Sequence, residues 1–241
     1  MEYKLKVSVK FISLIILHLG IFSPAFADQH ELFKGEAREN GKLVYIENHD
    51  VTFDDLGKVI EAKTVYVDPS GKVLGVLRSD FAKSLNMPDH IFVDERTKNK
   101  YGIRRSDEKL LMFSQEYGKE EVTSELESQK DKNRIQVGCQ GFNYFLKGKI
   151  DEFKKIKAQP VLFVIPGDFS TYKFVLEFIR ENADQTVDFK VKIENLFLRL
   201  FAPQLEFRYD KKINRIVWYK GISNIKSDQG KIMNVTIDYK Y

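Results

Sequence analysis

The stretch MNVTIDYKY (residues 233–241) alternates between apolar or aromatic residues and polar ones. A period of two is typical of an antiparallel strand that has one buried face and one solvated face. The same alternation recurs in VDFKVKI (residues 187–193) and in LEFRYD (residues 205–210). These stretches predict that the chain is mainly β.

Turn signals separate further segments of this kind, among them ENG (residues 39–41), DPSG (68–71) and SDQG (227–230). The pattern predicts strands at residues 31–38, 42–53, 58–67, 72–79, 90–97, 101–106, 108–116, 161–166, 171–180, 187–193, 204–209, 214–220 and 231–240. Consecutive strands with short connections form a meander. We therefore expect one large antiparallel sheet, curved into a half-barrel or closed into a barrel.

Three segments depart from this pattern. Residues 119–133 (KEEVTSELESQKDKN) are charged and nearly free of apolar side chains, which predicts a solvated polar loop. In residues 141–157 apolar side chains recur near helical spacing, and residues 194–201 form a shorter run that stops before Pro203. We expect one to three short helices, packed on the concave face of the sheet.

A curved sheet with an apolar helix on its concave face can hold an acyl chain or another apolar ligand. The sequence offers the apolar side chains of the predicted helix, and its single tryptophan, as candidates. The candidate ligand-binding residues are Phe142, Phe145, Leu146, Phe153 and Trp218.

The N-terminus has the pattern of an export signal. Lys4, Lys6 and Lys10 form a positively charged region before an apolar run at residues 11–22, and small residues follow up to Ala27. We predict that residues 1–27 are a signal peptide cleaved after Ala27, and that residues 28–241 form a single β-rich domain in the periplasm. The apolar run is shorter than the roughly 20 residues that a spanning helix needs. No second run of that length follows, so no helical membrane span is expected after cleavage.

Composition argues against several other classes of protein. The chain carries 39 Lys and Arg against 35 Asp and Glu, interspersed and without a basic stripe, so no nucleic-acid partner is expected. His30, His49 and His90 do not show metalloprotease spacing, and a single cysteine excludes a zinc site built on Cys/His spacing. Neither a metal nor a cofactor is predicted.

The single cysteine, Cys139, lies far beyond the signal peptide and has no second thiol with which to pair. Gly138 and Gly141 flank it, which predicts a turn with Cys139 as a small packed residue. A hydrolase that uses Cys139 or Asp94 stays open as an alternative. For Asp94 the competing interpretation is a surface ion pair with Arg96.

An outer-membrane β-barrel, or another membrane-associated protein, is a second alternative. The aromatic last residue, Tyr241, follows apolar side chains at alternate positions, as in the closing strand of such a barrel. An apolar exterior with a polar lumen and an apolar interior with a polar exterior give the same period. Periodicity therefore leaves both possibilities open.

Several short segments resemble a group of exported, largely uncharacterised bacterial proteins: YVDPSGK (66–72), SDF (79–81), FVDER (92–96), GFNYF (141–145), YD (209–210) and YKGISNI (219–225). The expected architecture is similar to the curved-sheet lipoprotein carriers of the LolA/LolB type. The resemblance implies a periplasmic, non-enzymatic protein. It also implies a lipid or apolar small molecule as ligand and an envelope protein as a possible partner.

Overall fold

The computed structural model describes residues 29–107, 109–127, 130–195 and 204–241. Within them the chain is mainly β and forms one large curved sheet, as the alternation predicts. The strands are β1 (Gln29–Glu39), β2 (Lys42–Phe53), β3 (Val59–Val67), β4 (Val73–Asp80), β5 (Asp89–Asp94), β6 (Lys100–Ser106), β7 (Lys109–Gln115), β8 (Val122–Glu125), β9 (Ile135–Gly138), β10 (Ala158–Ile165), β11 (Ser170–Glu181), β12 (Thr186–Ile193), β13 (Leu205–Asp210), β14 (Arg215–Lys226) and β15 (Ile232–Lys240).

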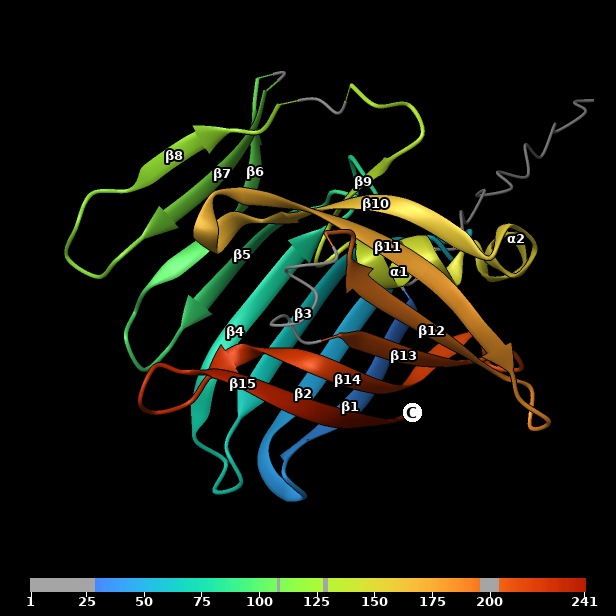
Figure 1. Cartoon of the computed structure of the whole chain (residues 1–241). Helices are drawn as coiled ribbons and strands as arrows, with labels where there is room; N and C mark the ends of the chain where they lie inside the picture. The colour runs from blue at the N-terminus through green and yellow to red at the C-terminus, as the bar shows by residue number, and fades with distance from the viewer. Residues whose placement is uncertain (1–28, 108, 128–129, 196–203) are drawn as a thin grey trace, which may run out of the picture.

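The sheet consists of two arms that meet at β1, which pairs with both β2 and β15 (Figure 1). The N-terminal arm runs from β1 to β8, and the C-terminal arm runs from β15 back to β9. All consecutive strands pair with each other except β8 and β9, which is the predicted meander. The two edges, β8 and β9, follow each other in the chain without pairing, so the sheet is curved but not closed.

Local sequence explains where the strands turn. Asn40 and Gly41 both adopt positive φ, 50° and 81°, as a two-residue hairpin turn between β1 and β2 requires. At the turn between β3 and β4 the carboxylate of Asp68 accepts hydrogen bonds from the backbone N–H groups of Ser70 and Lys72. These residues fix which side chains of the flanking strands share a face.

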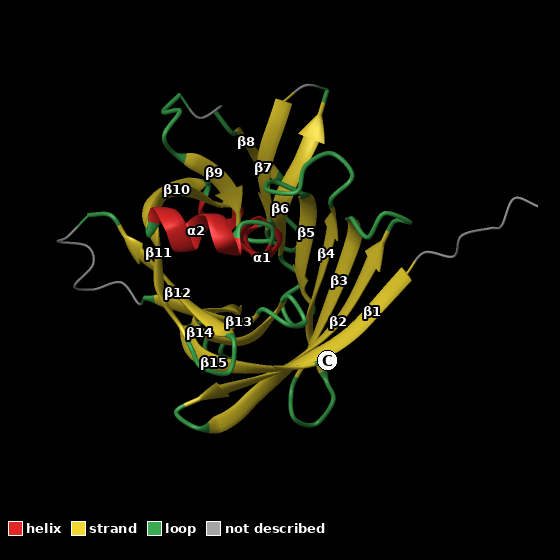
Figure 2. Cartoon of the chain, turned by 90° about the vertical axis from the view of Figure 1, so that its right-hand side faces the viewer, coloured by secondary structure: helices red, strands yellow, loops and turns green. Residues whose placement is uncertain are grey.

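One pair of strands departs from the antiparallel pattern. β9 and β10 are parallel, and a parallel pair needs a crossover connection. That connection contains α1 (Phe142–Lys147) and α2 (Ile150–Ile156), which lie inside the curve of the sheet (Figure 2). A β-carbon at Gly141 would lie 2.1 Å from the carbonyl oxygen of Asn86, so only glycine allows the chain to turn into α1 there. The helices that the sequence predicts near residues 141–157 thus lie on the concave face.

Backbone and apolar contacts link the two arms near the unpaired edges β8 and β9. The backbone N–H of Gly138 donates to the carbonyl of Asn86, at 2.9 Å, from the loop that follows β4. The short 3₁₀ helix η1 (Pro166–Asp168) follows β10, and its contacts lie along β6 and β7. A small apolar cluster joins both arms: Met87, Ile103, Met112, Leu126 and Val164.

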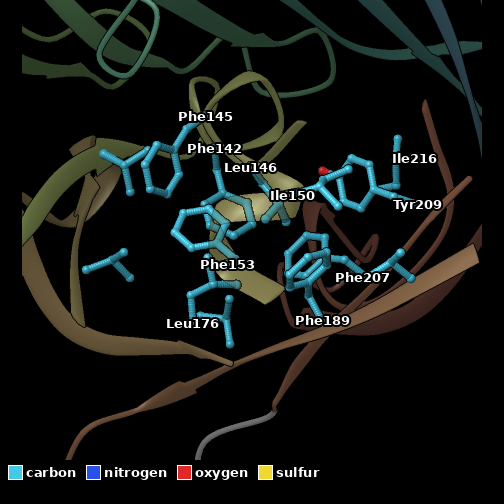
Figure 3. Packing of buried hydrophobic residues seen from close by; sticks show 14 of the residues in the cluster. Phe142, Phe145, Leu146, Ile150, Phe153, Leu176, Phe189, Phe207, Tyr209 and Ile216 are labelled. Atoms are coloured by element: carbon cyan, nitrogen blue, oxygen red, sulfur yellow. The ribbon is translucent and has the colours of Figure 1, made fainter. Parts of the chain in front are cut away.

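The largest core cluster lies between the helices and the C-terminal arm (Figure 3). Its buried residues are Val137, Phe142, Phe145, Leu146, Ile150, Phe153, Val161, Phe163, Leu176, Val187, Phe189, Val191, Phe207, Tyr209 and Ile216. The inner face of β12 supplies Val187, Phe189 and Val191, the alternating residues of its sequence. Burial of this apolar face explains why the alternation is strict there.

The structure corrects two sequence predictions. β8 lies within the segment predicted as a polar loop, because its backbone pairs with β7 although its only apolar side chain, Val122, is exposed. Cys139 is exposed rather than packed, and it belongs to none of the core clusters. The predicted signal peptide at residues 1–27, and all but two residues of the helix predicted at 194–201, lie outside the described residues.

Candidate binding site on the concave face

Four of the candidate ligand-binding residues come together in the core. Phe142, Phe145, Leu146 and Phe153 are each at most 3% exposed. The ring of Phe142 lies 4.9 Å from that of Phe163, centroid to centroid, and those of Phe145 and Phe153 lie 5.4 Å apart. These side chains therefore fill the concave face of the C-terminal arm themselves.

Trp218 does not join them. It pairs across the sheet with Arg208, whose guanidinium lies 5.8 Å from the centre of the indole ring. A β-bulge explains this position: β14 uses two steps, from Ile216 to Trp218, where β13 uses one. The extra residue turns Trp218 away from the core, where simple alternation from Ile216 would place it inside.

The helices leave part of the concave face uncovered, and aromatic side chains lie there. Phe33 on β1 stacks on His49 of β2, with 4.3 Å between ring centroids and 9° between planes. The ring of Tyr241 also stacks on Phe33, with 4.7 Å between ring centroids. The ring of Tyr239 lies 6.2 Å from that of Phe33 in an edge orientation. We call Phe33, His49, Tyr239 and Tyr241 the aromatic surface. It exists because β15 pairs with β1.

A buried carboxylate lies beneath the aromatic surface. Glu47 is 4% exposed, and its Oε2 lies 3.0 Å from Nε2 of His49. The hydroxyl of Tyr239 donates to the same oxygen at 3.3 Å, and Oγ1 of Thr64 lies 2.9 Å from Nδ1 of His49. Each polar group in this set has a partner, as buried polar groups require. The set holds the imidazole and the phenol at fixed positions under the uncovered surface.

Further tyrosines extend the uncovered area toward the middle of the molecule. Tyr101 on β6 and Tyr219 on β14 are only half-buried. Burial is nevertheless the main cause that raises the pKa of Tyr101 and that of Tyr219, to well above the ordinary value. Both hydroxyls are therefore neutral at physiological pH and serve as hydrogen-bonding, apolar-bodied groups.

Charged side chains lie at one end of this area. Arg215 forms an ion pair with Glu31, and its guanidinium lies 5.2 Å from the centre of the Tyr241 ring. Lys147 of α1 lines the same small crevice of about 20 Å³, and desolvation is the first cause that lowers its pKa. The aromatic surface thus has an apolar middle and a charged rim.

The candidate catalytic residues show no arrangement for hydrolysis. Cys139 is exposed as a residue, but the protein that surrounds its thiol inside the curve of the sheet desolvates it and raises its pKa to about 11, so the reactive thiolate is disfavoured. Sγ of Cys139 lies 3.6 Å from the carbonyl oxygen of Val164. Asp94 forms an ion pair with Arg96 at 2.7 Å, which is the alternative to a catalytic role that the sequence analysis considers for Asp94. Partial burial opposes ionisation of Asp94, but the hydrogen bonds from Arg96 prevail and lower its pKa.

No group of three or more His, Cys, Asp or Glu residues in the described part of the chain could hold a metal ion. None of its helices is long and apolar enough to cross a membrane.

None of the four residues of the aromatic surface is among the candidate ligand-binding residues that the sequence predicts. The alternation in residues 233–241 does place Tyr239 and Tyr241 on the apolar face of their strand. Their meeting with Phe33 and His49 depends on the pairing of β15 with β1, which no local signal predicts.

Comparison with known proteins adds little. No protein-family model matches the chain, and no curated protein matches it. Among solved structures, a β-barrel-like protein of a domain of unknown function (DUF1849) from Brucella abortus is 8% identical, with a TM-score of 0.43. That match covers 88% of this chain and 96% of the other chain.

Proposed function

We propose that this chain is an exported, non-enzymatic binding protein that holds a lipid or another hydrophobic ligand on the concave face of its sheet. The observation that carries the proposal is the aromatic surface. Its rings are stacked and in part exposed, beside a core cluster from which α1 and α2 exclude water. An apolar ligand lying there would extend that cluster.

The chemistry of the surface favours an apolar ligand over a charged one. The one carboxylate beneath it, Glu47, already has His49 and Tyr239 as partners. The rings offer large apolar area, and removal of apolar area from water is worth about 25 cal/mol per Å². The ion pair of Arg215 and Glu31 at the rim would suit the polar end of an amphipathic ligand.

Export is the second part of the proposal and rests on the sequence of residues 1–27. Cell fractionation tests it with the full chain and with a chain that lacks these residues. The full chain should leave the cell with the periplasmic fraction after osmotic shock. Recovery only in detergent would instead favour the outer-membrane alternative, and recovery with the cytoplasm would refute export.

Native mass spectrometry of protein made with its own signal peptide tests the ligand. We expect bound lipid in the wild type and at least tenfold less in Phe33→Ala, which removes the ring that His49 and Tyr241 stack on. Trp218→Phe is the matched control, because that side chain lies on the other face. Repeated isolation of lipid-free wild type, or equal loss in both variants, would refute the proposal.

A further inference from the structure

A groove of about 690 Å³ lies on the N-terminal arm, on the face opposite the core. Its volume is within the range of small-molecule sites, about 300–1,000 Å³. Strand alternation shows which face it occupies: Lys63 and Arg78 line it, whereas their neighbours Thr64 and Leu77 are buried on the concave side. We call this recess the charged groove. It is separate from the aromatic surface.

Charges of one sign lie directly opposite each other along the charged groove. Lys63 of β3 pairs in register with Arg78 of β4, and Glu61 pairs with Asp80 two residues further along. On its other side Lys63 lies opposite Asp50 of β2, so Arg78 is the residue of this pair with no opposite charge across the sheet. Asp80 in turn lies opposite Asp89. Like charges on directly opposed residues destabilise a sheet, so this arrangement costs stability in the free protein.

The protein compensates only part of this charge. Asp89 forms an ion pair with Arg105, and Asp50 with His30. Lys63, Arg78 and Glu61, in contrast, have no side-chain hydrogen bond or ion pair with any residue that the structure describes. Lys63, Arg78 and Glu61 thus lie side by side in a recess of ligand size, where an external ligand could pair with their charges.

The groove also has an apolar part. Ile91 and Phe113 line it, and between their strands lies Gly102, where a β-carbon would come within 1.9 Å of the carbonyl oxygen of His90. Glycine keeps this position free of side chain. Arg104 lies over the Phe113 ring at 4.8 Å and pairs with Glu121 at 2.6 Å, which fixes this end of the recess.

We propose that the charged groove binds a short peptide with free termini. Its carboxylate would lie on Lys63 and Arg78, and its ammonium group on Glu61 and Asp80. The two rows are two residues apart along the strands, which is about 6.7 Å at the rise of an extended chain. That separation suits the termini of a dipeptide, and an apolar side chain of the peptide would contact Ile91.

Isothermal titration calorimetry with the dipeptide Ala-Phe tests the proposal. The wild type should bind the free peptide at least tenfold more tightly than the same peptide acetylated and amidated at its ends. Arg78→Gln should lower the affinity at least tenfold, as should Glu61→Gln. Lys173→Gln, an exposed lysine on β11 of the other arm, is the matched control and should bind as the wild type does.

Stability provides an independent readout. Because Arg78→Gln removes a like-charge contact, the ligand-free variant should unfold about 1–3 °C above the wild type. Equal binding of free and capped peptide would overturn the proposal, as would binding unchanged in Arg78→Gln. Loss of binding in Arg78→Gln alone, with inorganic phosphate competing against the peptide, would show an anion site and would also overturn it. None of these outcomes depends on lipid on the concave face.

Discussion

The concave faces of the two arms differ in how far other elements cover them. On the C-terminal arm α1 and α2 cover the face, and the side chains between helix and sheet are almost entirely buried. On the N-terminal arm α1 contributes Tyr144, which packs against the cluster of Val51, Val59 and Phe81. Beside that contact the face carries the half-buried Phe33 together with Glu47 and His49. The comparison shows that one sheet can be a packed core at one end and carry a partly exposed aromatic surface at the other.

The difference follows from where the chain crosses over. The crossover between β9 and β10 places both helices beside the strands that it joins, at the far edge of the C-terminal arm. Within the described residues, the turns and loops that join consecutive strands of the N-terminal arm contain no helix. The inner positions of β12 are accordingly aliphatic or phenyl, and those of β2 include an acid and an imidazole.

The largest expected effect lies in the covered arm. Phe153→Ala removes a ring that is 1% exposed and contacts Phe145 and Phe189. We expect the free energy of unfolding to fall by about 3–5 kcal/mol, through lost burial and the cavity left behind. Urea denaturation measures it. Ile156→Ala, on the same helix but 44% exposed, should cost less than about 1 kcal/mol. Similar losses in both variants would contradict a packed core under α2.

The second effect concerns pH and the N-terminal arm. Burial lowers the pKa of His90 to about 4, against about 6.5 for an unfolded histidine. Between these values the unfolded chain binds more protons, so stability is complete above about pH 6.5 and falls as the pH decreases toward 4. We expect a loss of about 2 kcal/mol between pH 6.5 and 5, measured by urea denaturation at each pH.

His90→Gln provides the control for this pH dependence. The variant lacks the imidazole and should lose less than half as much stability over the same interval. Equal slopes in the wild type and the variant would show that His90 is not the group that titrates.

A smaller effect is expected under the aromatic surface. Glu47→Ala leaves Nε2 of His49 and the hydroxyl of Tyr239 without their shared acceptor. A buried donor without a partner costs about 1–3 kcal/mol, and chemical denaturation should show this loss. The double variant with Tyr239→Phe should lose less than the sum of the two single changes, since both act on one hydrogen bond. If the losses of the two single variants add up exactly in the double variant, Tyr239 and Glu47 do not share a stabilising hydrogen bond.

The smallest effect is expected on the outer face. Trp218→Phe should lower the free energy of unfolding by less than about 1 kcal/mol, because the indole is half-buried and contacts Arg208 rather than the core. Trp218 is also the single tryptophan. Its fluorescence should therefore stay nearly constant when an apolar ligand binds the aromatic surface. A large shift of the emission would place Trp218 next to that ligand.

The sequence predicts most of this fold because most strands show a clear alternation of apolar and polar residues. Val187, Phe189 and Val191 are buried exactly as their period requires. β8 and β9 escape prediction, because strands of four residues are too short for a period and Val122 is not buried. The parallel pairing of β9 with β10 is a tertiary feature that four residues cannot encode locally.

The site is less predictable than the fold, for two physical reasons. Trp218 is misplaced by simple alternation, because one extra residue in β14 reverses the faces beyond Ile216. The aromatic surface combines residues from both ends of the described chain, Phe33 and Tyr239 among them, and only the pairing of β1 with β15 brings them together.

The pairing of β1 with β15 has a consequence for how the chain could be rewired. The strands follow one another around the sheet in a cyclic rotation of their order in the chain, and the break falls between β8 and β9. Tyr241 already lies against Phe33. A circular permutant, with Tyr241 linked to the start of β1 and new ends between β8 and β9, would keep every strand pair. Where the sheet opens and where the polypeptide ends are thus independent properties of this molecule.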